Sequence, residues 1–143
     1  MCGIIGWINI NITQDKGFEF YRERLRHRGP DDYGVWKSTN KNVVLGHCRL
    51  SIIDLSKEGH QPKVMSHGRY IIVFNGEIYN YLEIRKKLER VGYFFKSSGD
   101  TEVVLASYIE WGERSLERFN GMFAFAIYDQ GNNSQSPSLF IAR

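Results

Sequence analysis

The first candidate for chemistry is the N-terminus, which reads Met1-Cys2-Gly3. Removal of Met1 would leave Cys2 with a thiol and a free α-amine on the same residue. An α-amine titrates near ~8 and a thiol near ~8.5, so roughly a tenth or more of the amine is unprotonated at neutral pH. Such an amine can act as a base beside its own nucleophile, as an N-terminal threonine does. The alternative is that Cys2 is only a small residue at the start of a strand.

Arg49 and the segment Asn75-Gly76-Glu77 could serve such a nucleophile. Arg49 lies in an apolar β-rich run, where an arginine usually needs a carboxylate, either from a substrate or from a structural ion pair. Asn75 and Gly76 offer a side-chain amide and a backbone N–H for an oxyanion hole, in which each donor is worth about 3–4 kcal/mol of barrier. The same Asn-Gly pair between two apolar runs predicts a type I′ hairpin turn.

Two further segments combine turn residues with charged groups. Asp100 precedes an expected helix, where it is either the N-cap or a ligand-binding residue, and the two roles are compatible. Residues 27–32 form an expected loop, because Gly29 and Pro30 end the preceding helix. Cys48 is interpreted as a small core residue. Three histidines could in principle serve a cysteine as a base, but none has a spacing that indicates this role. They are His47, His60 and His67.

The hydrophobic pattern predicts alternating groups of strands and helices. Strands are expected at residues 3–12, 43–53, 70–74, 94–95, 122–128 and 139–141. Helices are expected at residues 18–26, 81–91 and 101–111, with a helical turn at 115–119. The fold class is therefore α+β or layered α/β, most simply sheets covered by helices.

Length and composition narrow the class of protein. The chain has 143 residues, 42% of them hydrophobic, which is enough for one domain with a core. A net charge of +3 is too small to indicate a nucleic-acid partner. Two cysteines without a C-x-x-C motif predict neither a disulfide framework nor a metal site. The sequence contains no secretory signal and no apolar run long enough for a membrane span, so a cytoplasmic location is expected.

Read together and in order, these segments resemble the glutaminase domain of class II glutamine amidotransferases, which are N-terminal-nucleophile hydrolases. The matching stretches span nearly the whole chain, and the forms of residues 49–54 and 74–80 favour the branch of glutamine-hydrolysing asparagine synthetases. The resemblance rests on residues 2–6, 27–32, 46–54, 59–62, 74–80, 99–103 and 121–126.

The resemblance implies a four-layer αββα sandwich, in which two stacked antiparallel sheets lie between helices. It implies hydrolysis of L-glutamine to L-glutamate and ammonia through a γ-glutamyl thioester on Cys2. Cys2 would be the nucleophile and, through its α-amine, the base and acid. Asn75 and Gly76 would form the oxyanion hole and contact the substrate.

The resemblance also implies how the rest of glutamine is held. Arg49 would bind the α-carboxylate, for which its planar fork is suited. Asp100 would bind the α-ammonium, with Glu77 beside it, and the loop 28–30 would wall the site without a chemical step. The remaining pocket residues would contribute mainly backbone, and these are Leu50, Ile52 and Ile53.

Residues 1–143 are expected to be an incomplete glutaminase domain, because the family continues with a further segment and then an ATP-dependent synthetase domain. No cofactor is expected in residues 1–143, whereas ATP and Mg are expected in the synthetase domain, which would be the main partner besides glutamine. A homodimer is also expected. The fragment alone should have weak or no activity. Two alternatives stay open: an amidotransferase with another ammonia acceptor, as in surface-sugar or antibiotic synthesis, and a non-catalytic glutamine-binding or partner-binding module.

Overall fold

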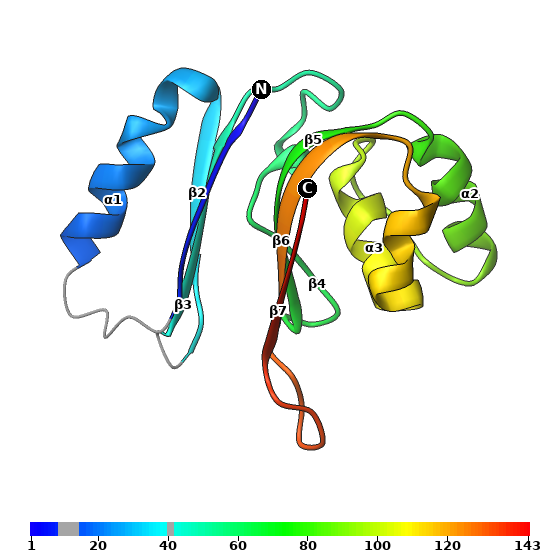
Figure 1. Cartoon of the computed structure of the whole chain (residues 1–143). Coiled ribbons are helices and arrows are strands. Elements are labelled where there is room, and N and C mark those ends of the chain that lie inside the picture. The colour runs from blue at the N-terminus through cyan, green and yellow to red at the C-terminus, as the bar shows by residue number, and fades with distance from the viewer. Residues whose placement is uncertain (9–14, 40–41) are drawn as a thin grey trace.

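The computed structural model describes residues 1–8, 15–39 and 42–143, which fold into four layers (Figure 1). One helix covers a three-stranded sheet, and this sheet packs face to face on a four-stranded sheet. Two further helices cover the other face of the four-stranded sheet. The expected α+β sandwich of αββα layers is therefore confirmed.

The three-stranded sheet is antiparallel and has the order β1-β3-β2. Helix α1 (Asp15–Arg24) contacts β1 and β3. Every residue of β3 is buried, because α1 lies on one face of the strand and the second sheet on the other. The strand at residues 32–37 was not expected, and residues 9–12 of the expected first strand lie outside the described residues. The strands are β1 (Gly3–Ile8), β2 (Asp32–Lys37) and β3 (Val43–Arg49), with a 3-10 turn η1 at Arg26–Arg28.

The four-stranded sheet has the order β4-β5-β6-β7 and is also antiparallel. The predicted hairpin at Asn75-Gly76 was wrong, because β5 continues through both residues and pairs with β6 as far as Ile78. A side chain at Gly76 would collide with the Met122 carbonyl oxygen of β6, so the glycine serves close strand packing and not a turn. The strands are β4 (Lys63–Met65), β5 (Tyr70–Ile78), β6 (Gly121–Asp129) and β7 (Ser138–Ala142).

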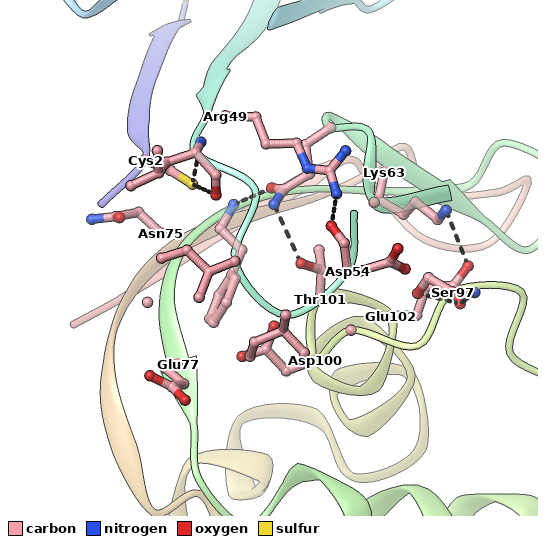
Figure 2. A pocket seen from close by; sticks show the side chains of 18 of the residues that line it. Cys2, Arg49, Asp54, Lys63, Asn75, Glu77, Ser97, Asp100, Thr101 and Glu102 are labelled. Atoms are coloured by element: carbon pink, nitrogen blue, oxygen red, sulfur yellow. Dashed lines mark hydrogen bonds and ion pairs between the residues drawn. The ribbon is translucent and has the colours of Figure 1, made fainter. Parts of the chain in front are cut away.

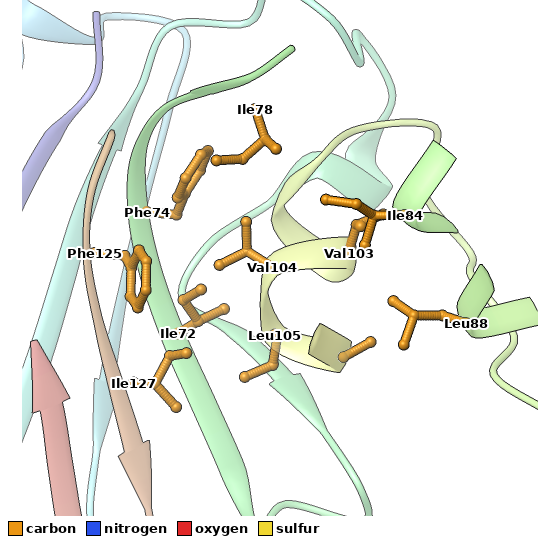
Figure 3. Close-up of a cluster of buried hydrophobic side chains, with 11 residues drawn as sticks. Ile72, Phe74, Ile78, Ile84, Leu88, Val103, Val104, Leu105, Phe125 and Ile127 are labelled. Atoms are coloured by element: carbon orange, nitrogen blue, oxygen red, sulfur yellow. The ribbon is translucent and has the colours of Figure 1, made fainter. Parts of the chain in front are cut away.

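Helices α2 (Tyr81–Arg90) and α3 (Thr101–Trp111) lie on the outer face of the four-stranded sheet, close to the expected ranges. In α2 the buried residues Ile84 and Leu88 are one turn apart, as an amphipathic helix requires. They pack with the apolar first half of α3 and the outer face of β5 and β6 (Figure 3). The predicted strand at residues 94–95 was wrong: this segment is a loop in which Phe94 is 92% exposed. Two further 3-10 segments are η2 (Lys57–Gly59) and η3 (Gly112–Arg118).

A second core lies between the two sheets. Val43 and Leu45 of β3 pack against Ile71 and Val73 of β5, and Tyr128 of β6 completes the group. This contact fixes β3 against β5. Because β1 pairs with β3, the N-terminus is thereby held beside the C-terminal half of β5.

Candidate active site

One cavity opens where β1 begins, where β3 ends and where β5 passes the start of α3 (Figure 2). Every site residue that the sequence suggested lines it, although they come from four separate parts of the chain. Ile52 and Ile53 are exposed, whereas Arg49 and Asp100 are buried. The full set is Cys2, Arg49, Leu50, Ile52, Ile53, Asn75, Gly76, Glu77 and Asp100.

The Cys2 thiol is half-buried and is held by backbone groups. Its Sγ lies 3.3 Å from the Leu50 amide nitrogen, which donates to it, and 3.6 Å from the Leu50 carbonyl oxygen. The Arg28 Nε donates to the Cys2 carbonyl oxygen at 3.0 Å. Arg28 of the loop 28–30 thus contacts Cys2 itself, but no residue of this loop lines the cavity. A backbone N–H directed at sulfur stabilises a developing thiolate.

The edge of β5 is open beside Cys2 because β4 stops early. Register places Ile72 opposite Lys63, the first residue of β4, and no strand covers the edge beyond that point. The Tyr79 amide donates to the Asn120 carbonyl oxygen on the β6 side. Backbone amides alternate in direction along a strand, so the amides at the even-numbered positions of β5 point away from β6. The Gly76 N–H therefore points away from β6 at this open edge.

The amides on either side of Gly76 along this edge are both occupied. The Phe74 N–H donates to Gln61 Oε1 at 2.7 Å, and the Ile78 N–H donates to Asp100 Oδ2 at 3.0 Å. The Gly76 N–H has no such acceptor among the described residues, which leaves it available to a bound molecule. Asn75 lies near Cys2 in Figure 2. Its side-chain Oδ1 is buried and has no hydrogen-bond partner among the described residues.

Arg49 is buried at the end of β3 and contacts backbone oxygens. Its Nη1 donates to the Ser56 carbonyl at 2.9 Å and its Nη2 donates to the Asp54 carbonyl. These bonds use two of the five guanidinium N–H groups. A side chain at Gly59 would overlap Nη2, so that glycine makes room for the guanidinium.

The Asp54 carboxylate ties the loop beyond β3 to the segment before α3. It accepts hydrogen bonds from the Ser56 amide at 2.7 Å and the Ser98 amide at 3.0 Å. Burial opposes ionisation, but these bonds and the charge of Arg49 lower the pKa of Asp54 to about 2. The carboxylate is therefore ionised at neutral pH. It joins the loop that binds the Arg49 guanidinium to the segment that leads into Asp100.

Asp100 is buried beside the exposed Glu77. Asp100 takes the expected N-cap position of α3, but its side chain makes no capping hydrogen bond there and accepts from the Ile78 amide instead. Burial raises the pKa of Asp100, backbone hydrogen bonds oppose that shift, and the charge of Glu77 raises it further. Two carboxyl groups at this end of the cavity suit a positively charged ligand group.

A buried ion pair at the other end of the cavity was not found from the sequence. Glu102 lies 3.2 Å from Lys63 Nζ and accepts from the Ser97 amide at 2.8 Å and the Ser97 hydroxyl at 2.9 Å (Figure 2). Burial opposes ionisation, but Ser97 and Lys63 lower the pKa of Glu102. A carboxylate inside the otherwise apolar start of α3 was the available signal for this network.

The histidines do not contact the Cys2 thiol. His47 is fully buried between the sheets, and its Nε2 lies 3.0 Å from the Phe74 carbonyl oxygen. His60 pairs with Asp32 at 2.7 Å. No group of histidine, cysteine and acidic residues that could hold a metal occurs within residues 1–8, 15–39 and 42–143.

Comparison with known proteins decides the family. A protein-family model described as a glutamine amidotransferase domain matches residues 1–143. The chain belongs to this family. The amidotransferase domain is 39% identical to asparagine synthetase (glutamine-hydrolyzing) 3 of Bacillus subtilis, covering 100% of the chain and 23% of that protein. It is 40% identical to asparagine synthetase B of Escherichia coli, covering 90% of the chain and 23% of that protein.

Further matches agree with this assignment. A putative asparagine synthetase of Mycobacterium tuberculosis is 46% identical over 83% of the chain and 19% of its own length. The amidotransferase domain thus spans about a fifth of the length of these curated relatives. Glutamine phosphoribosylpyrophosphate amidotransferase of Bacillus subtilis has a TM-score of 0.70 at 19% identity, covering 92% of this chain and 36% of that one. This likeness shows that the two proteins share their fold.

Proposed function

We propose that this domain hydrolyses L-glutamine to L-glutamate and ammonia through a thioester on Cys2. The observation that carries the proposal is that one cavity is lined by the Cys2 thiol, by Gly76 with its unoccupied amide, and by the charged residues Arg49 and Asp100. Arg49 would bind the α-carboxylate of glutamine. Asp100, with Glu77, would bind the α-ammonium, which leaves the side-chain amide of the substrate facing Cys2.

The reaction follows from these positions. The thiol proton passes to the α-amine of Cys2 as Sγ bonds to the amide carbon of glutamine. Asn75 and Gly76 would donate to the oxyanion, each such donor being worth about 3–4 kcal/mol of barrier. The C–N bond then breaks and the proton leaves with the amine as ammonia. Water adds to the thioester, the C–S bond breaks, and glutamate and the free thiol are released.

The proposal requires that Met1 is removed, because the nitrogen of Cys2 is otherwise part of a peptide bond and cannot act as a base. Met1 is 68% exposed and the following Cys2 is small, which suits an aminopeptidase. Intact mass spectrometry of active protein from the native host should give a mass without Met1. A mass that includes Met1 in fully active protein would reject the α-amine mechanism.

The wider proposal is that the ammonia supplies an ATP-dependent synthetase domain that converts aspartate to asparagine. The names of the relatives support this, as does the length by which they exceed the matched region. ATP and Mg would bind in that domain, and the whole protein would be a cytoplasmic homodimer. Within the described residues no helix is long and apolar enough to cross a bilayer. An acceptor other than aspartate is the alternative, and assays with both acceptors separate the two.

The direct test is glutamate release by the protein at its natural length, by Cys2→Ala and by the matched control Cys48→Ala. Cys48 is buried and lies one residue before Arg49, so its loss tests the effect of removing a thiol without the nucleophile. Only Cys2→Ala should abolish hydrolysis. A wild-type protein that binds glutamine but releases no glutamate would favour the non-catalytic module instead. We also expect residues 1–143 alone to show weak activity or none.

A further inference from the structure

The open edge of β5 is closed at one residue by two side chains from elsewhere in the chain. His47 Nε2 lies 3.0 Å from the Phe74 carbonyl oxygen, and Gln61 Oε1 accepts from the Phe74 amide at 2.7 Å. Because a carbonyl oxygen can only accept, His47 Nε2 carries the proton and donates. Phe74 is thus held on both of its peptide groups, immediately before Asn75 and Gly76.

Both side chains are themselves fixed. His47 is fully buried in β3, between the two sheets. Gln61 is 5% exposed, and its Nε2 lies 3.3 Å from the Thr101 hydroxyl at the start of α3. They therefore connect Phe74 to the three-stranded sheet on one side and to helix α3 on the other.

We propose that His47 and Gln61 are positioning residues that hold Asn75 and Gly76 in place as oxyanion donors. The Phe74 carbonyl and the Asn75 nitrogen belong to one planar peptide group, so the bond from His47 fixes that plane. Donors must lie about 2.7–3.1 Å from the oxyanion, and a site held to within about 0.5 Å is needed. This inference rests on the proposed glutamine hydrolysis.

The two side chains are needed because the neighbouring strand is missing at this point. The pairing of β4 with β5 ends at Ile72. The sheet itself therefore does not restrain that edge of β5 at Phe74. A strand with one free edge can shift by more than catalysis allows. Two buried side chains supply the missing donor and acceptor and leave the next outward amide, that of Gly76, unoccupied.

The test uses the protein at its natural length with three variants and one control. His47→Leu removes the donor, Gln61→Met removes the acceptor at similar length, and His47→Gln restores an N–H donor. Ser107→Ala is the matched control, because Ser107 is fully buried and donates to the Val103 carbonyl within α3 at 2.7 Å, away from the cavity. Each variant is measured for kcat, for glutamate affinity and for the rate at which iodoacetamide alkylates Cys2.

We expect kcat to fall about 10- to 100-fold in His47→Leu and Gln61→Met, since losing one oxyanion donor altogether costs about 100- to 1000-fold. Alkylation should stay within about twofold, because displacement at the carbon of iodoacetamide forms no oxyanion. Glutamate affinity should fall much less than kcat, because Arg49 and Asp100 would still hold the other end of the ligand. His47→Gln should recover most of kcat, and Ser107→Ala should retain it. If His47→Leu does not fold, Gln61→Met provides the same comparison.

Two results would overturn the inference and they are distinguishable. If the wild type hydrolyses glutamine but both variants keep kcat within about twofold, or lose glutamate affinity and alkylation together with kcat, the positioning role is wrong and hydrolysis stands. If the wild type releases no glutamate at all, the proposed function fails and the positioning role fails with it.

Discussion

Burial of His47 predicts a specific dependence of stability on pH. Burial lowers the pKa of His47 from 6.5 to about 4, against a smaller raising effect of its bond to the Phe74 carbonyl. Its Nδ1 is buried without a partner in the described chain, so a second proton there would find no acceptor. The charges of Arg49 and His60 also lower this pKa, and Asp32 raises it.

The sign follows from proton uptake. Between pH 6.5 and about 4 the unfolded chain protonates this histidine while the folded chain does not. The stability that neutral His47 permits is therefore complete above pH 6.5 and declines as pH falls through this window. The gap between 6.5 and about 4 corresponds to about 3 kcal/mol, at about 1.4 kcal/mol for each pKa unit.

The assay is urea unfolding followed by tryptophan fluorescence, for the wild type and for His47→Gln, at several values between about pH 7 and 4.5. A glutamine side chain at position 47 does not titrate. The unfolding free energy of His47→Gln should therefore fall by about 2–3 kcal/mol less than that of the wild type over this range. The difference between the two proteins removes the contribution of every other titrating group. Parallel curves, or a His47 pKa near 6.5 measured by NMR, would refute the reasoning.

Three further substitutions test contacts around the cavity. Gly59→Ala should displace the Arg49 guanidinium and raise the KM for glutamine about 10- to 100-fold with a smaller effect on kcat, measured by steady-state glutaminase kinetics. Asp54→Asn should lower the unfolding free energy by about 2 kcal/mol at neutral pH in urea unfolding; the depressed pKa means that the deficit disappears between pH 3.8 and about 2. Glu102→Gln should cost about 3 kcal/mol in the same measurement, because Lys63 loses its buried partner.

Each of these expectations has a control or a contrary outcome. Gly99→Ala is matched to Gly59→Ala, because Gly99 lines the same cavity but a side chain there would only touch Asp54 at an ordinary 3.5 Å. An equal rise in KM for both variants would contradict the argument about Arg49. A deficit of Asp54→Asn that stays constant down to pH 2, or a Glu102→Gln protein as stable as the wild type, would contradict the other two.

The sequence predicted those elements whose signal is local. The helices at residues 81–90 and 101–111 follow from apolar spacing, and Gly92 signals the end of the first of them. β2 was missed because Gly34 interrupts its β-forming residues. In the structure a side chain at Gly34 would collide with the Gln61 carbonyl, so the glycine reflects a distant contact. The hairpin at Asn75-Gly76 failed for the same reason, since the glycine reflects the close approach of β6, where a side chain would meet the Met122 carbonyl oxygen and Phe123, the register partner of Gly76.

The candidate site shows the same division. Residues in distinctive local patterns, such as Cys2 and Asp100, could be selected from the sequence because their types suggest chemistry. Gln61 and Asp54 could not, because the contacts that give them a role join residues 13 and 44 positions apart and depend on the fold. Glu102 was also missed, although its carboxylate in the otherwise apolar start of α3 was a local signal. A sequence pattern identifies groups that could react, whereas the groups that hold them are defined by packing.

The spacing along β5 also bears on which substrate fits. The amides of Gly76 and Ile78 point the same way and are two residues apart, about 6.6–6.8 Å along a strand. Asp100 is fixed by the Ile78 amide at 3.0 Å, so the proposed site for the α-ammonium lies one strand repeat from the proposed oxyanion donor. Asparagine has one methylene fewer than glutamine and cannot reach both at once. Its kcat/KM for ammonia release should be about 10- to 200-fold lower, and equal rates for the two amides would mean that Asp100 does not set the position of the substrate.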